Sequence, residues 1–262
     1  MLLTVDIGNT NIKVGAWDGD ALIFVSSMRT DLRGTPDEYA AKLLDVFRLR
    51  DSNSGQFDGA MIASVVPPLS NILLMSVKQV LQTDRVYLVS PGMVRALGVK
   101  TDRPEQLGAD LVCAAAAVIE KMPLPCLFIG LGTATVIFVI DENAQILGGA
   151  LSPGIGISLE ALAKKTAQLP HISLDNPGEL IGGNTIGCMK SGIVYGTAAM
   201  LDGMIGRFRE EIGGTLSLTA FGGFARAIIP HCRERITIDE SLVLEGLKIL
   251  YGRAMEKGEI PS

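Results

Sequence analysis

Residues 4–15, TVDIGNTNIKVG, join two apolar runs through a polar turn. The strand-like alternation stops at Asp6, a Gly-Asn-Thr segment follows, and the apolar pattern resumes around Lys13. A strand in a protein core gains nothing from an aspartate or a lysine, because burying an unpaired charge costs free energy. The stretch is therefore either an ordinary polar turn or a turn that holds a charged ligand.

The residues of this turn have the properties that a phosphate-binding loop needs. Gly8 lets backbone N–H groups approach an anion without a Cβ in the way, and Asn9 and Thr10 add side-chain donors. The ammonium of Lys13 is placed to reach a phosphate as a point charge, and Asp6 is suited to Mg²⁺, which takes few carboxylates and keeps much of its hydration. The same residue types are also common in turns for purely local reasons.

A second glycine turn lies in the other half of the chain. Residues 126–154, CLFIGLGTATVIFVIDENAQILGGALSPG, repeat the order strand, Gly-Thr turn, strand, Asp-Glu-Asn turn, strand. Gly132 aligns with Gly8, and Thr133 and Thr135 belong to the second turn. A repeat of architecture favours two related domains over one irregular domain, and it favours ligand binding over an ordinary turn.

The order of elements predicts an α/β protein with two domains, residues 1–122 and 123–262, and a cleft between their first hairpins. The predicted strands are 2–6, 12–17, 21–28, 59–65, 86–89, three strands within 126–154, and 216–221. The predicted helices are 36–48, 69–82, 107–121, 155–168, 187–212, 223–231 and 242–255.

Composition excludes several classes of protein. Of the 262 residues, 48% are hydrophobic and 19% charged, and no apolar run reaches the roughly 18 residues of a membrane span. The net charge of −5 disfavours a general nucleic-acid binder, which needs a basic face. No basic leader precedes the first strand, so we expect a cytoplasmic protein without membrane or nucleic-acid partners. The four scattered cysteines predict neither a disulfide framework nor a zinc site.

Three later stretches are further candidates. Gly108 and Asp110 open an alanine-rich helical pattern, where Asp110 is either a helix-start residue or a general base toward a substrate hydroxyl. Gly222-Gly223 follows a strand and precedes a helix, a place where backbone can lie against a nucleotide base or ribose. Asn184-Thr185 opens a long helix and serves either as its cap or as a ligand contact.

Eight stretches, in order along nearly the whole chain, resemble the type III pantothenate kinases. They are DIGNTNIKVG, ASVVPPL, PEQLGAD, GTAT, GGALSPG, LAKKTAQLP, NTIGCMKSGIVYG and FGGFA. This family belongs to the superfamily of actin, sugar kinases and heat-shock-chaperone ATPases. The resemblance implies two ribonuclease-H-like domains, a homodimer, and ATP-dependent phosphorylation of pantothenate to 4′-phosphopantothenate, the first step of coenzyme A biosynthesis.

The resemblance also implies a role for each matching residue. Asp6 matches the metal-associated aspartate that works with Mg²⁺, and Asp110 matches the catalytic base. The nucleotide-binding positions are Gly8, Asn9, Thr10, Lys13, Gly132, Thr133, Thr135, Gly222 and Gly223. The positions that line the pantothenate pocket are Gly108, Ala109, Asp110 and Thr185.

The chain departs from the family pattern at two of these places. Leu111 stands where the family usually has an arginine that pairs with the substrate carboxylate, and we offer the hypothesis that Arg103 replaces it in substrate binding. Gly130 stands where the family usually has an aspartate that helps to hold an activating monovalent cation, K⁺ or NH₄⁺. Two alternatives to pantothenate kinase activity therefore stay open: a catalytically degenerate, nucleotide-binding homologue with a regulatory role, and a kinase for another small hydroxylated acceptor.

Overall fold

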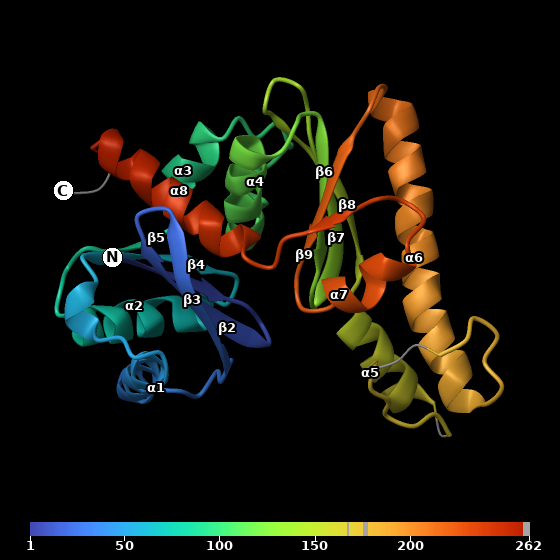
Figure 1. The fold of residues 1–262 in the computed structure, drawn as a ribbon, viewed down its shortest axis with the longest axis horizontal. Coiled ribbons are helices and arrows are strands. Elements are labelled where there is room, and N and C mark those ends of the chain that lie inside the picture. Colours follow the sequence, from blue (N-terminus) through green and yellow to red (C-terminus); the bar gives the residue numbers. More distant parts are fainter. Residues whose placement is uncertain (167, 175–177, 259–262) are drawn as a thin grey trace. The chain divides into compact units, whose positions relative to one another are not determined.

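A computed structural model describes residues 1–166, 168–174 and 178–258 of the chain. The chain divides into two compact units, each built on a five-stranded sheet (Figure 1). Unit 1 comprises Met1–Glu120 together with Ser241–Ser262, and unit 2 comprises Lys121–Glu240. The predicted α/β fold with two ribonuclease-H-like domains is confirmed.

The sheet of unit 1 has the strand order β3-β2-β1-β4-β5, with β1, β2 and β3 antiparallel and β4 and β5 parallel to β1. The strands are β1 (Leu2–Ile7), β2 (Asn11–Asp18), β3 (Ala21–Arg29), β4 (Gly59–Ser64) and β5 (Val86–Leu88). The hairpins form because apolar residues alternate on both sides of short polar turns, and the parallel strands follow helical crossovers.

Helices α1 (Pro36–Leu49) and α2 (Pro67–Leu81) cover one face of this sheet. The start of α1 is fixed by a capping box, in which Thr35 and Glu38 each satisfy a backbone N–H of the other. The buried side chains of Tyr39 and Leu43 pack with those of β1 and β2. The same unit contains α3 (Pro91–Ala96), α4 (Ala109–Lys121) and the short 3₁₀ helices η1 (Ser54–Gln56) and η2 (Pro104–Gln106).

The C-terminal helix α8 (Leu242–Glu256) packs on β1, β2 and β4 of unit 1. Its backbone also lies against α4, because a Cβ added to Gly246 would be 1.8 Å from the carbonyl oxygen of Cys113. The domain prediction placed this helix in the second domain, 123–262, and the structure corrects that assignment. The apolar stripe of a helix shows that one face is buried, but it does not show against which sheet.

The sheet of unit 2 has the order β10-β9-β6-β7-β8. Its strands are β6 (Cys126–Leu131), β7 (Ala134–Ile140), β8 (Ile146–Pro153), β9 (Ser217–Phe221) and β10 (Thr237–Ile238). Its helices are α5 (Ile155–Lys165), α6 (Thr185–Ile212), α7 (Ala225–Ile228) and the 3₁₀ helix η3 (Ile229–His231).

Two predicted helices of unit 2 differ from the observed ones, and one observed strand has no predicted counterpart. The predicted helix 223–231 is two short turns, α7 and η3, because Pro230 interrupts the α-helical hydrogen bonding. The predicted helix 155–168 ends at Lys165, and its residue 167 lies outside the described residues. Strand β10, only two residues long, was not predicted. Among the described residues, no helix combines the length and apolar character needed to cross a lipid bilayer.

Candidate active site

The first glycine turn connects β1 to β2 in unit 1. The backbone N–H of Gly8 donates to the carbonyl oxygen of Asn11 at 3.1 Å, and a Cβ at position 8 would be only 2.9 Å from that oxygen. Glycine is therefore required for the close approach that shuts the hairpin. Asn9 and Thr10 are exposed at its tip. Asp6 and Lys13 are paired opposite each other in the β1–β2 register, so both flank the same turn.

Two carboxylates of unit 1 influence each other electrostatically. Burial is the main cause that raises the pKa of Asp6 to about 7, the nearby charge of Asp110 raises it further, and Lys13 lowers it. Burial also raises the pKa of Asp110, although the backbone N–H of Leu111 donates to its Oδ1 at 2.8 Å and opposes the shift. Because the charges are alike and partly desolvated, the pair resists having both groups ionised unless a cation is present.

This environment is chemically suited to a hydrated divalent cation. Mg²⁺ is commonly held by one or two carboxylates together with water and phosphate oxygens. Among the described residues, no group of three or more His, Cys, Asp or Glu side chains is arranged as a metal site. A carboxylate whose pKa is raised by burial and by a like charge becomes easier to ionise when a divalent cation is bound beside it.

The start of α4 places Asp110. The carbonyl oxygen of Gly108 accepts from the N–H of Val112 at 3.0 Å, and a Cβ at position 108 would be 2.6 Å from Oδ1 of Asp110. The missing side chain of Gly108 therefore leaves room for the carboxylate. Leu111 is buried, so it belongs to the packing of α4 rather than to an exposed face. Arg103, immediately before η2, is exposed.

The second glycine turn connects β6 to β7 in unit 2 and has similar hydrogen bonding. The N–H of Gly132 donates to the carbonyl oxygen of Ala134 at 3.1 Å. Gly154 packs directly against this turn, since its N–H donates to Thr133 at 3.1 Å and a Cβ there would be 2.2 Å from the same carbonyl oxygen. Thr133 is exposed, whereas Thr135 is buried.

Gly222 joins the second turn from the end of β9. Its φ of +102° is a left-handed conformation that favours glycine, and a Cβ would be 2.5 Å from the carbonyl oxygen of Leu131. The N–H of Phe224 donates to that same oxygen at 3.1 Å. The structure therefore brings Gly222 to the β6–β7 turn, while the neighbouring Gly223 has open space where a side chain would be.

Hydrocarbon surrounds Gly130, the position where the family usually has an aspartate. A Cβ there would be 2.7 Å from Cγ2 of Val136 and 3.0 Å from Cζ of Phe221. A carboxylate could not be accommodated without moving these side chains. The packing around Gly130 is thus the packing of a core position rather than of a cation ligand.

Asn184 and Thr185 lie at the start of α6 in unit 2. The side chain of Asn184 accepts from the N–H of Gly187 at 2.8 Å, so its role as a helix cap is confirmed. Thr185 is exposed. It belongs to unit 2, whereas Gly108, Ala109 and Asp110 belong to unit 1.

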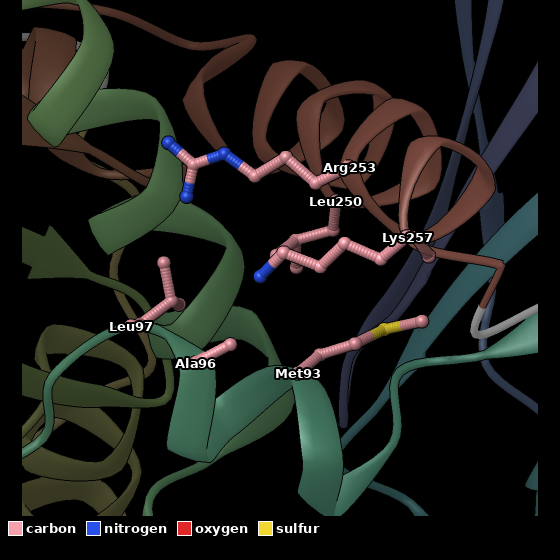
Figure 2. Close-up of a pocket in the computed structure, with 7 residues that line it drawn as sticks. Met93, Ala96, Leu97, Leu250, Arg253 and Lys257 are labelled. Atoms are coloured by element: carbon pink, nitrogen blue, oxygen red, sulfur yellow. The ribbon is translucent and has the colours of Figure 1, made fainter.

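A small hollow in unit 1 lies between α3 and α8 (Figure 2). The side chains of Arg253 and Lys257 contribute its only cationic groups, and Arg253 also pairs with Glu120. The apolar lining residues are Met93, Ala96, Leu97, Leu250 and Ala254. None of these residues is among the predicted site residues, so the hollow is not part of the candidate active site.

Sequence reasoning missed Thr30, which contacts the first turn directly. Its hydroxyl donates to the carbonyl oxygen of Gly8 at 2.7 Å. Thr30 follows an ordinary edge strand, and nothing in its immediate sequence distinguishes it from a loop residue. Only the three-dimensional pairing of β3 with β2 brings it to the turn.

Comparison with known proteins gives close sequence relatives over almost the full length. A chain from Syntrophus aciditrophicus named type III pantothenate kinase is 35% identical over 253 residues, covering 97% of this chain and 99% of that relative. A protein of the same name from an Exiguobacterium species (strain ATCC BAA-1283 / AT1b) is 39% identical, with the same coverage of both chains.

Solved structures with lower identity share the fold. A conserved putative Baf family transcriptional activator from Campylobacter jejuni superposes with a TM-score of 0.58 at 16% identity, covering 98% of this chain and all of that one. The activator of the 2-hydroxyisocaproyl-CoA dehydratase from Clostridium difficile, with bound ADPNP, superposes with a TM-score of 0.55 at 14% identity, covering all of this chain and 98% of that one.

The sequence profile of the type III pantothenate kinase family matches residues 2–207, well over half of the chain. The match includes the first glycine turn, the start of α4 and the second glycine turn. Together with relatives of 35–39% identity over 97% of its length, this match shows that the chain belongs to the type III pantothenate kinase family.

Proposed function

We propose that this chain transfers the γ-phosphoryl group of ATP to the primary hydroxyl of pantothenate, producing 4′-phosphopantothenate in the first step of coenzyme A biosynthesis. The observation that carries the proposal is the electrostatic cluster of Asp6, Lys13 and Asp110 beside the first glycine turn. Phosphoryl transfer depends on positioning the reactants and on neutralising charge, and this cluster supplies a lysine for the phosphates and a carboxylate for the acceptor.

Asp110 is the proposed general base. Burial raises the pKa of Asp110, and a raised pKa suits that role because a carboxylate of higher pKa takes a proton more effectively. Lys13 interacts with the phosphate oxygens as a point charge. Asp6 is the proposed ligand of Mg²⁺, which when bound neutralises charge on the phosphate oxygens.

The remaining site residues receive proposed binding roles. Asn9 and Thr10, with the backbone at Gly8, contact the phosphates of ATP, and the neighbour of the same fold that holds ADPNP supports nucleotide binding by this architecture. The nucleotide-binding residues of unit 2 are Gly132, Thr133, Thr135, Gly222 and Gly223. The pantothenate-binding residues are Arg103, Gly108, Ala109, Asp110 and Thr185.

A homodimer in the cytoplasm is the proposed assembly and location. Helix α6 exposes small residues, and open space surrounds the Cβ positions of Gly192, Gly196 and Gly203. Small side chains let two helices approach closely, so this face supports the proposal of an α6 contact between two copies.

A coupled ADP-release assay tests the proposed function. Pantothenate should give turnover, and related hydroxy acids that lack part of the pantothenate molecule should give little. Nucleotide binding without turnover on any acceptor would favour the regulatory alternative, and faster turnover on another alcohol would favour a different kinase.

Because Val136 and Phe221 crowd position 130, we expect the enzyme to have equal rates at high and low concentrations of K⁺ and NH₄⁺. Strong activation by either ion would mean that a cation is bound elsewhere in the protein.

Replacement of Arg103 tests pantothenate recognition. Arg103→Ala should raise the pantothenate KM about ten- to thirtyfold, roughly 1.4–2 kcal/mol, with little change in the KM for ATP, because the substrate carboxylate loses a cation. Arg103→Lys should recover part of the loss. Arg48→Ala, which removes another exposed arginine of unit 1, is the matched control. An unchanged pantothenate KM in Arg103→Ala would remove Arg103 from the site.

A further inference from the structure

We infer that Thr30 and Tyr39 are positioning residues that hold the first glycine turn in the shape that binds nucleotide phosphates. The inference rests on the proposed function only in naming the ligand of the turn. It assigns a role to residues that lie outside the motifs described above.

Thr30 contacts the turn at two points. Its hydroxyl donates to the carbonyl oxygen of Gly8 at 2.7 Å, and its N–H donates to the carbonyl oxygen of Thr10 at 3.0 Å. The second bond continues the β2–β3 pairing one residue beyond Asn11 and Arg29. Both carbonyl groups are thereby directed toward Thr30. The N–H groups of Asn9 and Thr10, which lie between these carbonyl groups in the chain, can then face an anion.

Tyr39 anchors the chain next to Thr30. Its hydroxyl accepts from the N–H of Asp31 at 2.9 Å and donates to the carbonyl oxygen of Asp31 at 2.8 Å. The ring is completely buried on α1, and a Cβ on Gly34 would be 2.7 Å from its Cε2. The ring therefore has a fixed position in the core, and its two hydrogen bonds hold the backbone of Asp31, the residue next to Thr30, in place.

The brace, meaning Tyr39, the backbone of Asp31 and the side chain of Thr30, connects a buried ring to an exposed turn. Without it, Asn9 and Thr10 would be held by the closing bond of Gly8, by the bond from the Thr30 N–H to the Thr10 carbonyl oxygen, and by β2, and the Gly8 carbonyl group would lose the Thr30 hydroxyl. If the turn becomes ordered only when the ligand binds, the free-energy cost of ordering weakens the affinity. A turn that is already ordered does not have this cost. The brace should therefore increase affinity for nucleotide more than it increases overall stability.

The test compares Thr30→Val, which removes the hydroxyl at nearly constant volume, with Thr30→Ser, which keeps it. Titration calorimetry with ADP and Mg²⁺ on the full chain should show Kd raised about five- to tenfold in Thr30→Val and changed less than twofold in Thr30→Ser. Tyr39→Phe should raise Kd about two- to threefold, and the double variant Thr30→Val/Tyr39→Phe should be no weaker than Thr30→Val alone, because both act through one connection.

Ser76→Ala is the matched control for general loss of stability. The Ser76 hydroxyl oxygen lies 2.8 Å from the carbonyl oxygens of both Pro36 and Ile72 in unit 1, so its one hydrogen is donated to either of them, and neither residue belongs to the glycine turn. Thr30→Val should also speed amide hydrogen exchange at residues 8–11, and Ser76→Ala should leave that exchange unchanged. Unchanged ADP affinity and unchanged exchange in Thr30→Val would overturn the brace, even if wild-type protein is an active kinase. Failure of the wild type to phosphorylate pantothenate while it binds ADP would instead overturn the proposed function and leave the affinity comparison valid.

Discussion

Asp110→Asn should lower kcat for pantothenate phosphorylation about 10²- to 10⁴-fold while changing the KM for ATP little. Asparagine keeps the size of the side chain and an oxygen that can accept from the N–H of Leu111, so the start of α4 is preserved. It cannot take a proton from the acceptor hydroxyl. Steady-state kinetics with ATP and pantothenate varied separately would measure the effect.

The pH profile supplies a second measure of the same role. Burial raises the pKa of Asp110 above its ordinary value. The pH profile of wild-type kcat/KM should therefore have an ascending limb at pH values above the pKa of an unperturbed aspartate. That limb should disappear in Asp110→Asn. Asp84→Asn, a change at an exposed carboxylate of the same unit, should leave both rate and profile intact. A kcat for Asp110→Asn within threefold of wild type would show that another group accepts the proton.

Local patterns were sufficient to predict both glycine hairpins. The alternation of apolar residues around DIGNTN and GTAT, together with glycine at each turn, reflects interactions between residues close in sequence. The observed register places Asp6 opposite Lys13, as a short turn between two paired strands requires. The sequence leaves open whether Asn184 caps a helix or contacts a ligand, and the structure shows the cap, in which its side chain accepts from a backbone N–H only three residues away.

Contacts between distant residues were not predictable in this way. The sequence predicts Asp6 and Asp110 as separate site residues. Their electrostatic interaction, and the burial that raises the pKa of both, depend on the packing of α4 in unit 1. The crowding of Gly130 by Phe221 and the bond from Thr30 to Gly8 also join segments far apart in the chain. The assignment of α8 to the wrong domain has the same origin, because the prediction followed chain order.

The raised pKa of Asp6 also affects how the free energy of unfolding depends on pH. A folded-state pKa of about 7 lies above the ordinary value of 3.8, so the folded protein binds more protons than the unfolded chain between these two pH values. The free energy of unfolding should therefore fall as pH rises through this window, and the favourable contribution of the protonated group is fully present only below about pH 3.8. The ionised Asp6 thus destabilises the metal-free fold at pH 8, where it is also most ready to bind a cation.

Asp6→Asn should consequently be more stable than wild type at pH 8 in EDTA, by about 2–4 kcal/mol, while losing at least about a hundredfold in kcat/KM. Asparagine removes the charge that burial and Asp110 oppose, and with it the proposed Mg²⁺ ligand. Urea unfolding at pH 5 and pH 8 measures the difference, which should shrink at pH 5 because wild-type Asp6 is then protonated. Asp84→Asn should show no such pH-dependent gain, since its carboxylate is fully exposed. Equal stability of Asp6→Asn and wild type at pH 8 would mean that Asp6 is not held in a desolvated, like-charged position. Retained kcat/KM in that variant would mean that the metal ion is bound elsewhere.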